Sequence, residues 1–268
     1  MDGGAGGDGG WWAPSAGDIP WQWELDHALS LSSAADMGTG EITYTGAAAA
    51  PPVVYDIDGF DNPASTITGL HALGAHVICY IEVGAAENYR PDYSQFPAAA
   101  LGSTVSGYSN EKYLNINDPT VLSVIKARID MCAGKGCDAI EPDIDDSYAS
   151  STGFTITQAQ TVTYDSTLAT YAHSKGLGWG LKNGDDPTFA SQMLPHVDFV
   201  LDEQCFQYST CAAFYPSFRQ AGKAVFEVEY QDQGGLSPSS FCPTANAYGF
   251  NSIQFTTPLD GTFRVPCR

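Results

Sequence analysis

The sequence predicts a parallel α/β barrel of the (β/α)8, TIM type, formed by a single domain. Helix-like stretches separate recurring apolar runs, and strands that alternate with helices favour a parallel sheet. Eight strands in about 250 residues make a closed barrel the expected form. The candidate strands are residues 19–25, 53–58, 76–83, 137–144, 176–183, 198–204, 224–230 and 251–257.

Start and stop signals mark three of the expected helices. Asp118-Pro119 places an N-cap residue directly before a proline, the usual first helical position. A second helix is expected at about 157–175, because Gly176 follows it as a C-terminal glycine should. A third is expected from Pro187 to just before Pro195.

Two segments stand outside this alternation. Residues 1–16 are rich in glycine at their start and are expected to form a flexible leader, so that the barrel spans 17–268. The connection from Gly84 to Pro119 is much longer than an ordinary loop. A long segment beyond the end of a strand is more often functional than idle, so we expect it to contribute to the site.

The chain is strongly acidic, with 31 acidic and 11 basic residues and a formal net charge of -20. Nucleic acid is a poor partner for such a chain, because phosphate binding relies on lysine and arginine. A cationic partner would be attracted by the same field. The sequence contains no run of about 18 apolar residues, so no membrane segment is expected.

Seven cysteines indicate a disulfide framework and therefore export into an oxidising compartment. Cys79 lies inside an apolar run and is expected to be a buried free thiol. Zinc is not expected, since no Cys-x2-Cys pair is present and the five histidines are scattered. No nucleotide-binding motif occurs, so no cofactor is expected either. The bridges expected from spacing and position are Cys132–Cys137, Cys205–Cys211 and Cys242–Cys267.

Carboxylates end most of the candidate strands, and they are densest around the fourth. Glu141, Asp143 and Asp145 alternate there, so they are expected to share one face of the strand. Their mutual repulsion raises some pKa values and can keep a proton on one acid near neutral pH. Glycoside hydrolysis needs this divergence between two carboxyls. The alternatives are an acid-rich surface turn or a calcium loop, although a calcium loop usually includes a glycine that is missing here.

Other strand ends supply further candidates. Asp202 and Glu203 end the sixth strand, next to the expected Cys205–Cys211 loop, which would hold that strand end rigid. Lys182 ends the fifth strand and is expected to offset part of the negative charge. The complete set expected to bind substrate is Trp23, Asp56, Asp58, Tyr80, Glu82, Asp145, Lys182, Asn183, Glu229 and Tyr230.

Seven motifs occur in unbroken order between residues 18 and 257. Together they resemble the endo-α-1,4-polygalactosaminidase family of glycoside hydrolases, and the acidic motif of the fourth strand is among the most specific. The motifs are Trp21-Gln22-Trp23-Glu24-Leu25, Val54-Tyr55-Asp56-Ile57-Asp58, Cys79-Tyr80-Ile81-Glu82-Val83-Gly84, Glu141-Pro142-Asp143-Ile144-Asp145, Gly180-Leu181-Lys182-Asn183, Glu203-Gln204-Cys205-Phe206-Gln207-Tyr208 and Gly222-Lys223-Ala224-Val225-Phe226.

The resemblance implies a (β/α)8 barrel that cleaves α-1,4-linked galactosamine polymers internally. It also implies a catalytic carboxylate pair, with Asp143 as the nucleophile and Glu203 as the general acid/base of a retaining enzyme. Asp145 remains an alternative to Asp143. The sequence departs from the family at two positions, where Glu24 stands in place of glutamine and Asp202 in place of asparagine.

The expected partner is a cationic amino-sugar polysaccharide, and the chain is expected to act as a secreted monomer. Two other functions remain open at this point. One is a barrel glycosidase that acts on other α-galactosides, and the other is a carbohydrate-binding barrel without turnover.

Overall fold

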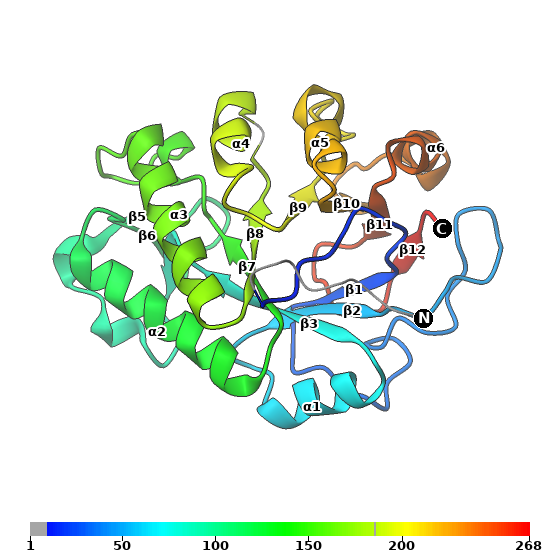
Figure 1. Ribbon diagram of the computed structural model, residues 1–268, viewed down its shortest axis with the longest axis horizontal. Helices are drawn as coiled ribbons and strands as arrows, with labels where there is room; N and C mark the ends of the chain where they lie inside the picture. Colours follow the sequence, from blue (N-terminus) through cyan, green and yellow to red (C-terminus); the bar gives the residue numbers. More distant parts are fainter. Residues whose placement is uncertain (1–9, 185) are drawn as a thin grey trace.

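The computed structural model describes residues 10–184 and 186–268, without the side chains of residues 212–215. All eight expected strands form, and they lie side by side in one curled sheet (Figure 1). Each neighbouring pair among these eight is parallel. In spatial order they are β1 (Trp21–Glu24), β2 (Val54–Asp58), β3 (His76–Glu82), β7 (Ala139–Asp143), β8 (Gly178–Lys182), β9 (Phe199–Glu203), β10 (Ala224–Tyr230) and β11 (Asn251–Phe255).

A ninth strand, β12 (Arg264–Pro266), lies antiparallel to β11 and follows it in the strand order. Side chains connect this end of the sheet to β1. The Trp21 indole N–H donates to the Asn251 carbonyl oxygen at 2.7 Å, and the Arg264 guanidinium donates to the Trp21 carbonyl oxygen at 2.6 Å. The barrel therefore has its seam between β1 and the end of the sheet formed by β11 and β12.

Six α-helices among the described residues cover the outside of the sheet. The Asp118 carboxylate accepts the Thr120 N–H at 2.7 Å, which confirms the predicted N-cap, and a capping box opens the helix predicted at 157–175. In the described part of the chain, the segments after β1 and after β11 contain no α-helix. The helices are α1 (Ala64–Ala72), α2 (Pro119–Lys135), α3 (Gln158–Ser174), α4 (Pro187–Met193), α5 (Cys211–Gln220) and α6 (Pro238–Tyr248).

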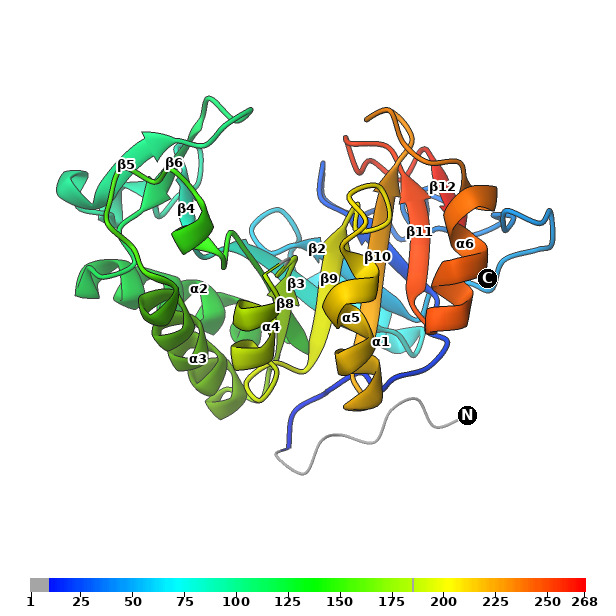
Figure 2. The ribbon, with the colours of Figure 1, turned by 90° about the horizontal axis from the view of Figure 1, so that it is seen from above.

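The long connection after β3 folds into a small sheet of its own, which the sequence did not predict. Its strands are β4 (Ala85–Glu87), β5 (Leu101–Thr104) and β6 (Glu111–Leu114), in the antiparallel order β4-β6-β5. Figure 2 shows this inserted sheet standing to one side of the barrel strands. Arg128 of α2 holds the beginning of this inserted segment in place. Its guanidinium donates to Asp92 at 2.7 Å and 3.1 Å and to the Glu82 carbonyl oxygen at 2.9 Å.

The predicted leader, residues 1–16, falls partly outside the described residues. Within the described part, Trp11 stacks on His173 at 3.9 Å and Trp12 stacks on His76 at 4.4 Å between ring centroids. The Ala16 N–H donates to the Gly222 carbonyl oxygen at 2.7 Å. Residues 11–16 therefore pack against the barrel, and the boundary at residue 16 stays a prediction.

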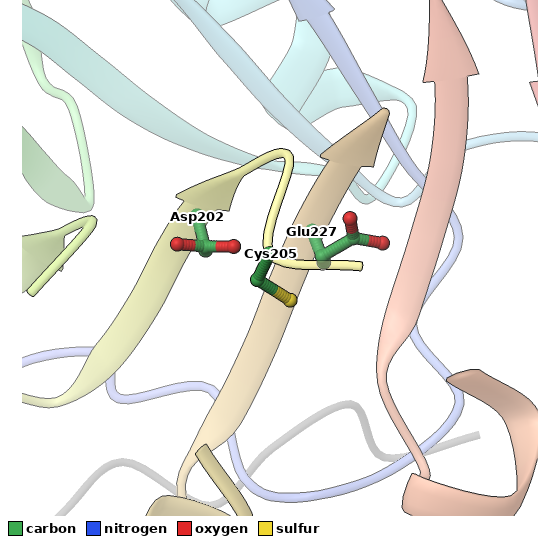
Figure 3. Close-up of side chains that lie close together, drawn as sticks. All are labelled: Asp202, Cys205 and Glu227. Atoms are coloured by element: carbon green, nitrogen blue, oxygen red, sulfur yellow. The ribbon is translucent and has the colours of Figure 1, made fainter. Parts of the chain in front are cut away.

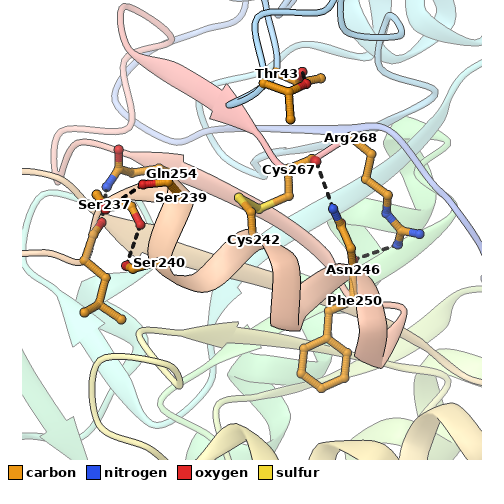
Figure 4. Close-up of a disulfide and its surroundings, with 12 residues drawn as sticks. Thr43, Ser237, Ser239, Ser240, Cys242, Asn246, Phe250, Gln254, Cys267 and Arg268 are labelled. Carbon is orange, nitrogen blue, oxygen red and sulfur yellow. Dashed lines mark hydrogen bonds between the residues drawn. A yellow bond between two sulfur atoms is a disulfide. The ribbon is translucent and has the colours of Figure 1, made fainter.

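Two of the three expected disulfides form, but the expected Cys132–Cys137 bridge and the expected free thiol at Cys79 were both wrong. Cys205–Cys211 and Cys242–Cys267 are bonded, and Figure 4 shows the second of them between α6 and the C-terminal end. Cys132 pairs with Cys79 instead of Cys137, because the outward face of β3 packs on the buried face of α2 and brings their Cα atoms to 6.1 Å. Cys137, not Cys79, is the buried free thiol.

Loss of the Cys79–Cys132 bridge should destabilise the barrel more than loss of Cys205–Cys211. The first bridge spans 53 residues and the second spans 6, so loop-closure entropy predicts about 4 and about 2 kcal/mol respectively. Denaturant unfolding of the two double-alanine variants measures this difference. Cys137→Ala is the control for thiol loss alone, and equal destabilisation by both double variants would contradict the expectation.

Candidate active site

A cleft of about 660 Å³ opens at the carboxyl ends of the barrel strands. Such a position is where barrel enzymes place their active sites. The cleft is rich in carboxylates and tyrosines and contains two cations, Arg90 and Lys182. Its lining residues are Trp23, Leu25, Asp26, Asp58, Asp61, Tyr80, Glu87, Tyr89, Arg90, Tyr108, Glu111, Asp143, Lys182, Glu203, Gln204, Tyr230, Gln233, Thr257, Pro258 and Leu259.

Asp143 is the last residue of β7, and its side chain is 23% exposed to the cleft. The Tyr80 hydroxyl donates to its Oδ2 at 2.9 Å, and the Ile144 N–H donates to its Oδ1 at 3.0 Å. These two donors and the Lys182 ammonium, 3.4 Å from Oδ1, hold the carboxyl in one orientation at the cleft. The arrangement suits a nucleophile.

Glu203 ends β9 and is 27% exposed to the same cleft. The Tyr230 hydroxyl donates to its Oε1. The Glu203 backbone N–H donates to Asn183 Oδ1 at 2.9 Å, so the neighbouring strand end holds this residue in place. Glu203 therefore has a fixed backbone and a carboxyl that solvent and a substrate can reach.

Lys182 lies between these two acids and has a side chain only 3% exposed. Its Nζ is 2.6 Å from Glu141 Oε1, 3.4 Å from Asp143 Oδ1 and 3.5 Å from Glu203 Oε2. The two oxygens on Asp143 and Glu203 are therefore less than about 7 Å apart, which admits the roughly 5–5.5 Å spacing of retaining glycosidases. One ammonium thus organises two acids from different strands.

Glu141 supports this ammonium from inside the barrel. It is fully buried, and the Trp23 indole N–H donates to its Oε2 at 3.1 Å. Burial raises the pKa of Asp56 well above its usual range, and the nearby Glu141 adds to the effect. Asp56 is fully buried and does not line the cleft.

Three neighbouring strands end in the same backbone turn. Ile144, Asn183 and Gln204 directly follow Asp143, Lys182 and Glu203, and their φ angles are 55°, 52° and 64°. Left-handed backbone is unfavourable for residues other than glycine, and most of all for a β-branched one. Strain of this kind persists where the surrounding structure enforces it, commonly at functional sites.

This turn places Asp145 off the face that Asp143 occupies, contrary to the alternation expected for Glu141, Asp143 and Asp145. Asp145 is 2% exposed, does not line the cleft, and accepts the Lys182 backbone N–H at 2.9 Å. The Asp145 carboxylate therefore holds the backbone of β8 and is not placed to contact a sugar in the cleft.

The other expected substrate-binding residues divide into two groups. Trp23, Asp58, Tyr80, Lys182 and Tyr230 line the cleft. Five others lie outside its lining: Asp56, Glu82, Asp145, Asn183 and Glu229. Glu229 faces the helix side, where it accepts the backbone N–H groups of Phe206 and Gln207.

The long connection was expected to contribute to the site, but none of its residues was among the candidates. Glu87, Tyr89, Arg90, Tyr108 and Glu111 all line the cleft. The aromatic and polar content of the long connection was visible in the sequence, but its strand pairing was not. Asp26, Asp61, Gln204 and Gln233 were also missed, since they lie on irregular loops.

Asp202, Cys205 and Glu227 lie close together beside β9 and β10, on the face of the sheet away from the barrel interior (Figure 3). Each offers an atom within 4.8 Å of the others, which is close enough for a metal ion. Cys205 is bonded to Cys211, however, so it has no thiolate to offer. Burial raises the pKa of Glu227 well above its usual range, and we interpret the group as packing around the Cys205–Cys211 bridge.

A strand-end acid pair in a barrel cleft is typical of a glycosidase, and the comparisons with known proteins agree. The model of the glycoside-hydrolase family GH114 matches residues 4–268. The chain belongs to family GH114. It is therefore a glycoside hydrolase. Among residues 10–184 and 186–268, no helix is both long and apolar enough to cross a membrane.

Solved structures resemble this GH114 chain along nearly its whole length. The crystal structure of Aspergillus fumigatus Ega3 in complex with galactosamine has a TM-score of 0.82 and 30% identity, with 99% of this chain and 100% of that chain covered. The glycoside hydrolase domain of PelA from Pseudomonas aeruginosa has a TM-score of 0.64 and 12% identity, covering 90% and 96%. The second likeness shows a shared fold.

A curated relative is an uncharacterized protein of Deinococcus radiodurans. It is 26% identical over 208 residues, which cover 69% of this chain and 66% of that protein. The chain thus spans just under two thirds of the length of this relative.

Glu24 should make the stability of the GH114 chain depend on pH. Burial raises its pKa from 4.5 to about 7. The folded state therefore binds this proton more tightly than the unfolded chain, and the stabilisation is complete below pH 4.5 and lost as pH rises through about 7. Glu24→Gln should match the wild type near pH 4.5 and exceed it by up to about 3 kcal/mol at pH 8.

Urea unfolding at the two pH values measures this difference. His27 lies 3.2 Å from Glu24, so the gain at pH 8 is reduced by whatever that contact contributes. Glu41→Gln removes one carboxylate elsewhere and is the control. A Glu24→Gln variant with the same pH dependence as the wild type would contradict the expectation.

Proposed function

We propose that this GH114 enzyme hydrolyses internal bonds of α-1,4-linked galactosamine polymers by a retaining mechanism. Asp143 acts as the nucleophile and Glu203 as the general acid/base. The observation that carries the proposal is the shared contact of both carboxyls with Lys182 at the cleft. Two acids from different strands are thereby held on either side of one ammonium, at a spacing that fits a single glycosidic bond.

In the first step Asp143 attacks the anomeric carbon while Glu203 transfers its proton to the leaving oxygen. Contacts with the Tyr80 hydroxyl and the Lys182 ammonium orient Asp143 for this attack. In the second step Glu203, now ionised, takes a proton from a water molecule that attacks the glycosyl–enzyme. The Tyr230 hydroxyl, which donates to Glu203, keeps that carboxyl oriented in both steps.

The nature of the substrate is supported by charge and by similarity. Galactosamine is the ligand in the Ega3 crystal structure, to which this chain is 30% identical. De-acetylated galactosamine bears an ammonium group, and the formal net charge of -20 would attract a polymer of such units. Three disulfides are typical of proteins that fold in oxidising compartments, so we propose a secreted enzyme.

The test is a panel of polymers offered to the purified protein. We expect reducing ends to appear from de-acetylated and partly acetylated α-1,4-galactosamine polymers, with oligomers released from the outset as an internal cut requires. Neutral α-galactosides should be poor substrates. Turnover of neutral α-galactosides alone, or of no polymer in the panel, would refute the proposal.

Salt should slow the enzyme on the cationic polymer. Raising the ionic strength from about 0.02 M to about 0.5 M shortens the screening length from roughly 20 Å to roughly 4 Å. We expect kcat/KM on de-acetylated polymer to fall about tenfold, because steering by the acidic surface is screened. The fully N-acetylated polymer is the neutral control, and an equal fall on both polymers would argue against steering.

A further inference from the structure

The inserted sheet forms one wall of the cleft. Glu87 ends β4, Glu111 begins β6, and Tyr108 precedes β6, with its carbonyl oxygen accepting the Glu111 N–H at 3.1 Å. All three residues line the cleft together with Asp143 and Glu203. Tyr108 is 57% exposed although it is a large aromatic residue. This wall is therefore open to a bound polymer.

Glu87 and Glu111 are direct partners in the β4–β6 register. Like charges placed opposite each other destabilise a strand pair, so a purely structural wall gains nothing from them. Glu82 at the end of β3 adds a third acid, and its side chain hydrogen-bonds Glu111. Three glutamates thus meet beside the proposed nucleophile.

The cations nearby compensate this group only in part. Arg90 and the Tyr89 hydroxyl donate to Glu87 Oε1 at 2.8 Å and 3.0 Å, and the other nitrogens of Arg90 hold Asp58. Glu87 Oε2 forms an ion pair with the Arg128 guanidinium at 3.8 Å but accepts no hydrogen bond, although the residue is 2% exposed. A buried carboxylate oxygen without a donor is costly, and a ligand that brings an N–H would remove the penalty.

We propose that Glu87 and Glu111, with the ring of Tyr108, form a subsite for one ammonium-bearing sugar of the polymer, next to the bond that is cleaved. This inference rests on the proposed function. An ammonium group supplies N–H donors and a positive charge to the two carboxylates. The exposed tyrosine ring offers an apolar face to the sugar.

Binding at this subsite should be linked to a proton. Burial raises the pKa of Glu111 to about 7, and the charges of Glu87 and Asp143 add to the effect. Besides these, Glu82 and Arg90 face the group, the first through its hydrogen bond and the second through its charge. Below pH 7 an arriving ammonium must displace the proton of Glu111, so affinity for the cationic sugar should rise with pH.

The experiment measures binding without turnover, in the Glu203→Gln background. De-acetylated galactosamine oligomers are titrated by calorimetry at pH 5.0 and pH 6.5, where their amino groups stay charged. We expect this background to bind several-fold more tightly at pH 6.5. Adding Glu111→Gln should weaken binding about tenfold at pH 6.5 and flatten the pH dependence. Glu41→Gln removes the same charge away from the cleft and should change neither the affinity nor its pH dependence.

The outcomes separate the subsite from the proposed function. The Glu203→Gln protein should bind N-acetylated oligomers equally well with and without the Glu111→Gln change. If Glu111→Gln behaves like Glu41→Gln, or weakens both kinds of oligomer alike, the subsite is refuted even when the wild type cleaves galactosamine polymers. In the active enzyme, a rise in KM on de-acetylated polymer with kcat nearly retained supports a binding role.

Discussion

Asp143→Asn and Glu203→Gln should each lower kcat on de-acetylated polymer by at least about 10³-fold, because each removes one half of an acid–nucleophile pair. Both substitutions keep the size of the side chain. Asp143→Asn still accepts the Tyr80 hydroxyl but loses its negative charge toward the anomeric carbon. Initial rates of reducing-end release measure the loss.

An activated aryl glycoside distinguishes the two roles. Its leaving group departs without a proton, so Glu203→Gln should recover the first step on this substrate while Asp143→Asn should not. Asp61→Asn is the matched control, since Asp61 also lines the cleft, with a side chain 50% exposed. If Asp143→Asn keeps more than a tenth of the wild-type kcat, Asp143 is not the nucleophile.

Lys182→Met should have the next largest effect, on both activity and folding. The substitution leaves Glu141, Asp143 and Glu203 without the ammonium that contacts all three. Removing one partner of a buried charge pair typically destabilises a protein by about 3–5 kcal/mol. Loss of the ammonium also raises the pKa of Glu141, since Lys182 lowers it in the wild type.

The activity of Lys182→Met should therefore fall steeply at neutral pH, and the acidic limb of its pH–activity profile should move to higher pH. Without the ammonium, Glu141 binds its proton at higher pH than in the wild type, and this changes the charge of the acid group beneath the cleft. Lys126→Met removes an ammonium that lies over the Tyr171 ring of α3, away from the cleft, and should leave the profile unchanged and the unfolding free energy near wild type. An unchanged acidic limb in Lys182→Met would show that the ammonium does not control the acids.

The sequence was sufficient to locate the strands because a buried parallel strand is a continuous apolar run. Each of the eight expected ranges contains one strand, and Asp118-Pro119 begins α2 as predicted. The membership of the chain in a carbohydrate-cleaving family also followed from motifs at strand ends.

Contacts between distant segments were not predictable in the same way. The Cys79–Cys132 bridge depends on how α2 packs on β3, whereas sequence spacing favoured the nearer Cys137. Asp145 leaves the expected face because Ile144 adopts a left-handed conformation that simple alternation ignores. Glu111 was not considered, since its strand lies inside a segment that reads as a loop.

The matching turns after Asp143, Lys182 and Glu203 have an evolutionary consequence. Asp143, Lys182 and Glu203 are the last residues of β7, β8 and β9, so the proposed reacting groups belong to the barrel and not to its loops. We expect segments beyond these turns to tolerate exchange between relatives, so that polymer preference can change while the proposed acid pair keeps its place.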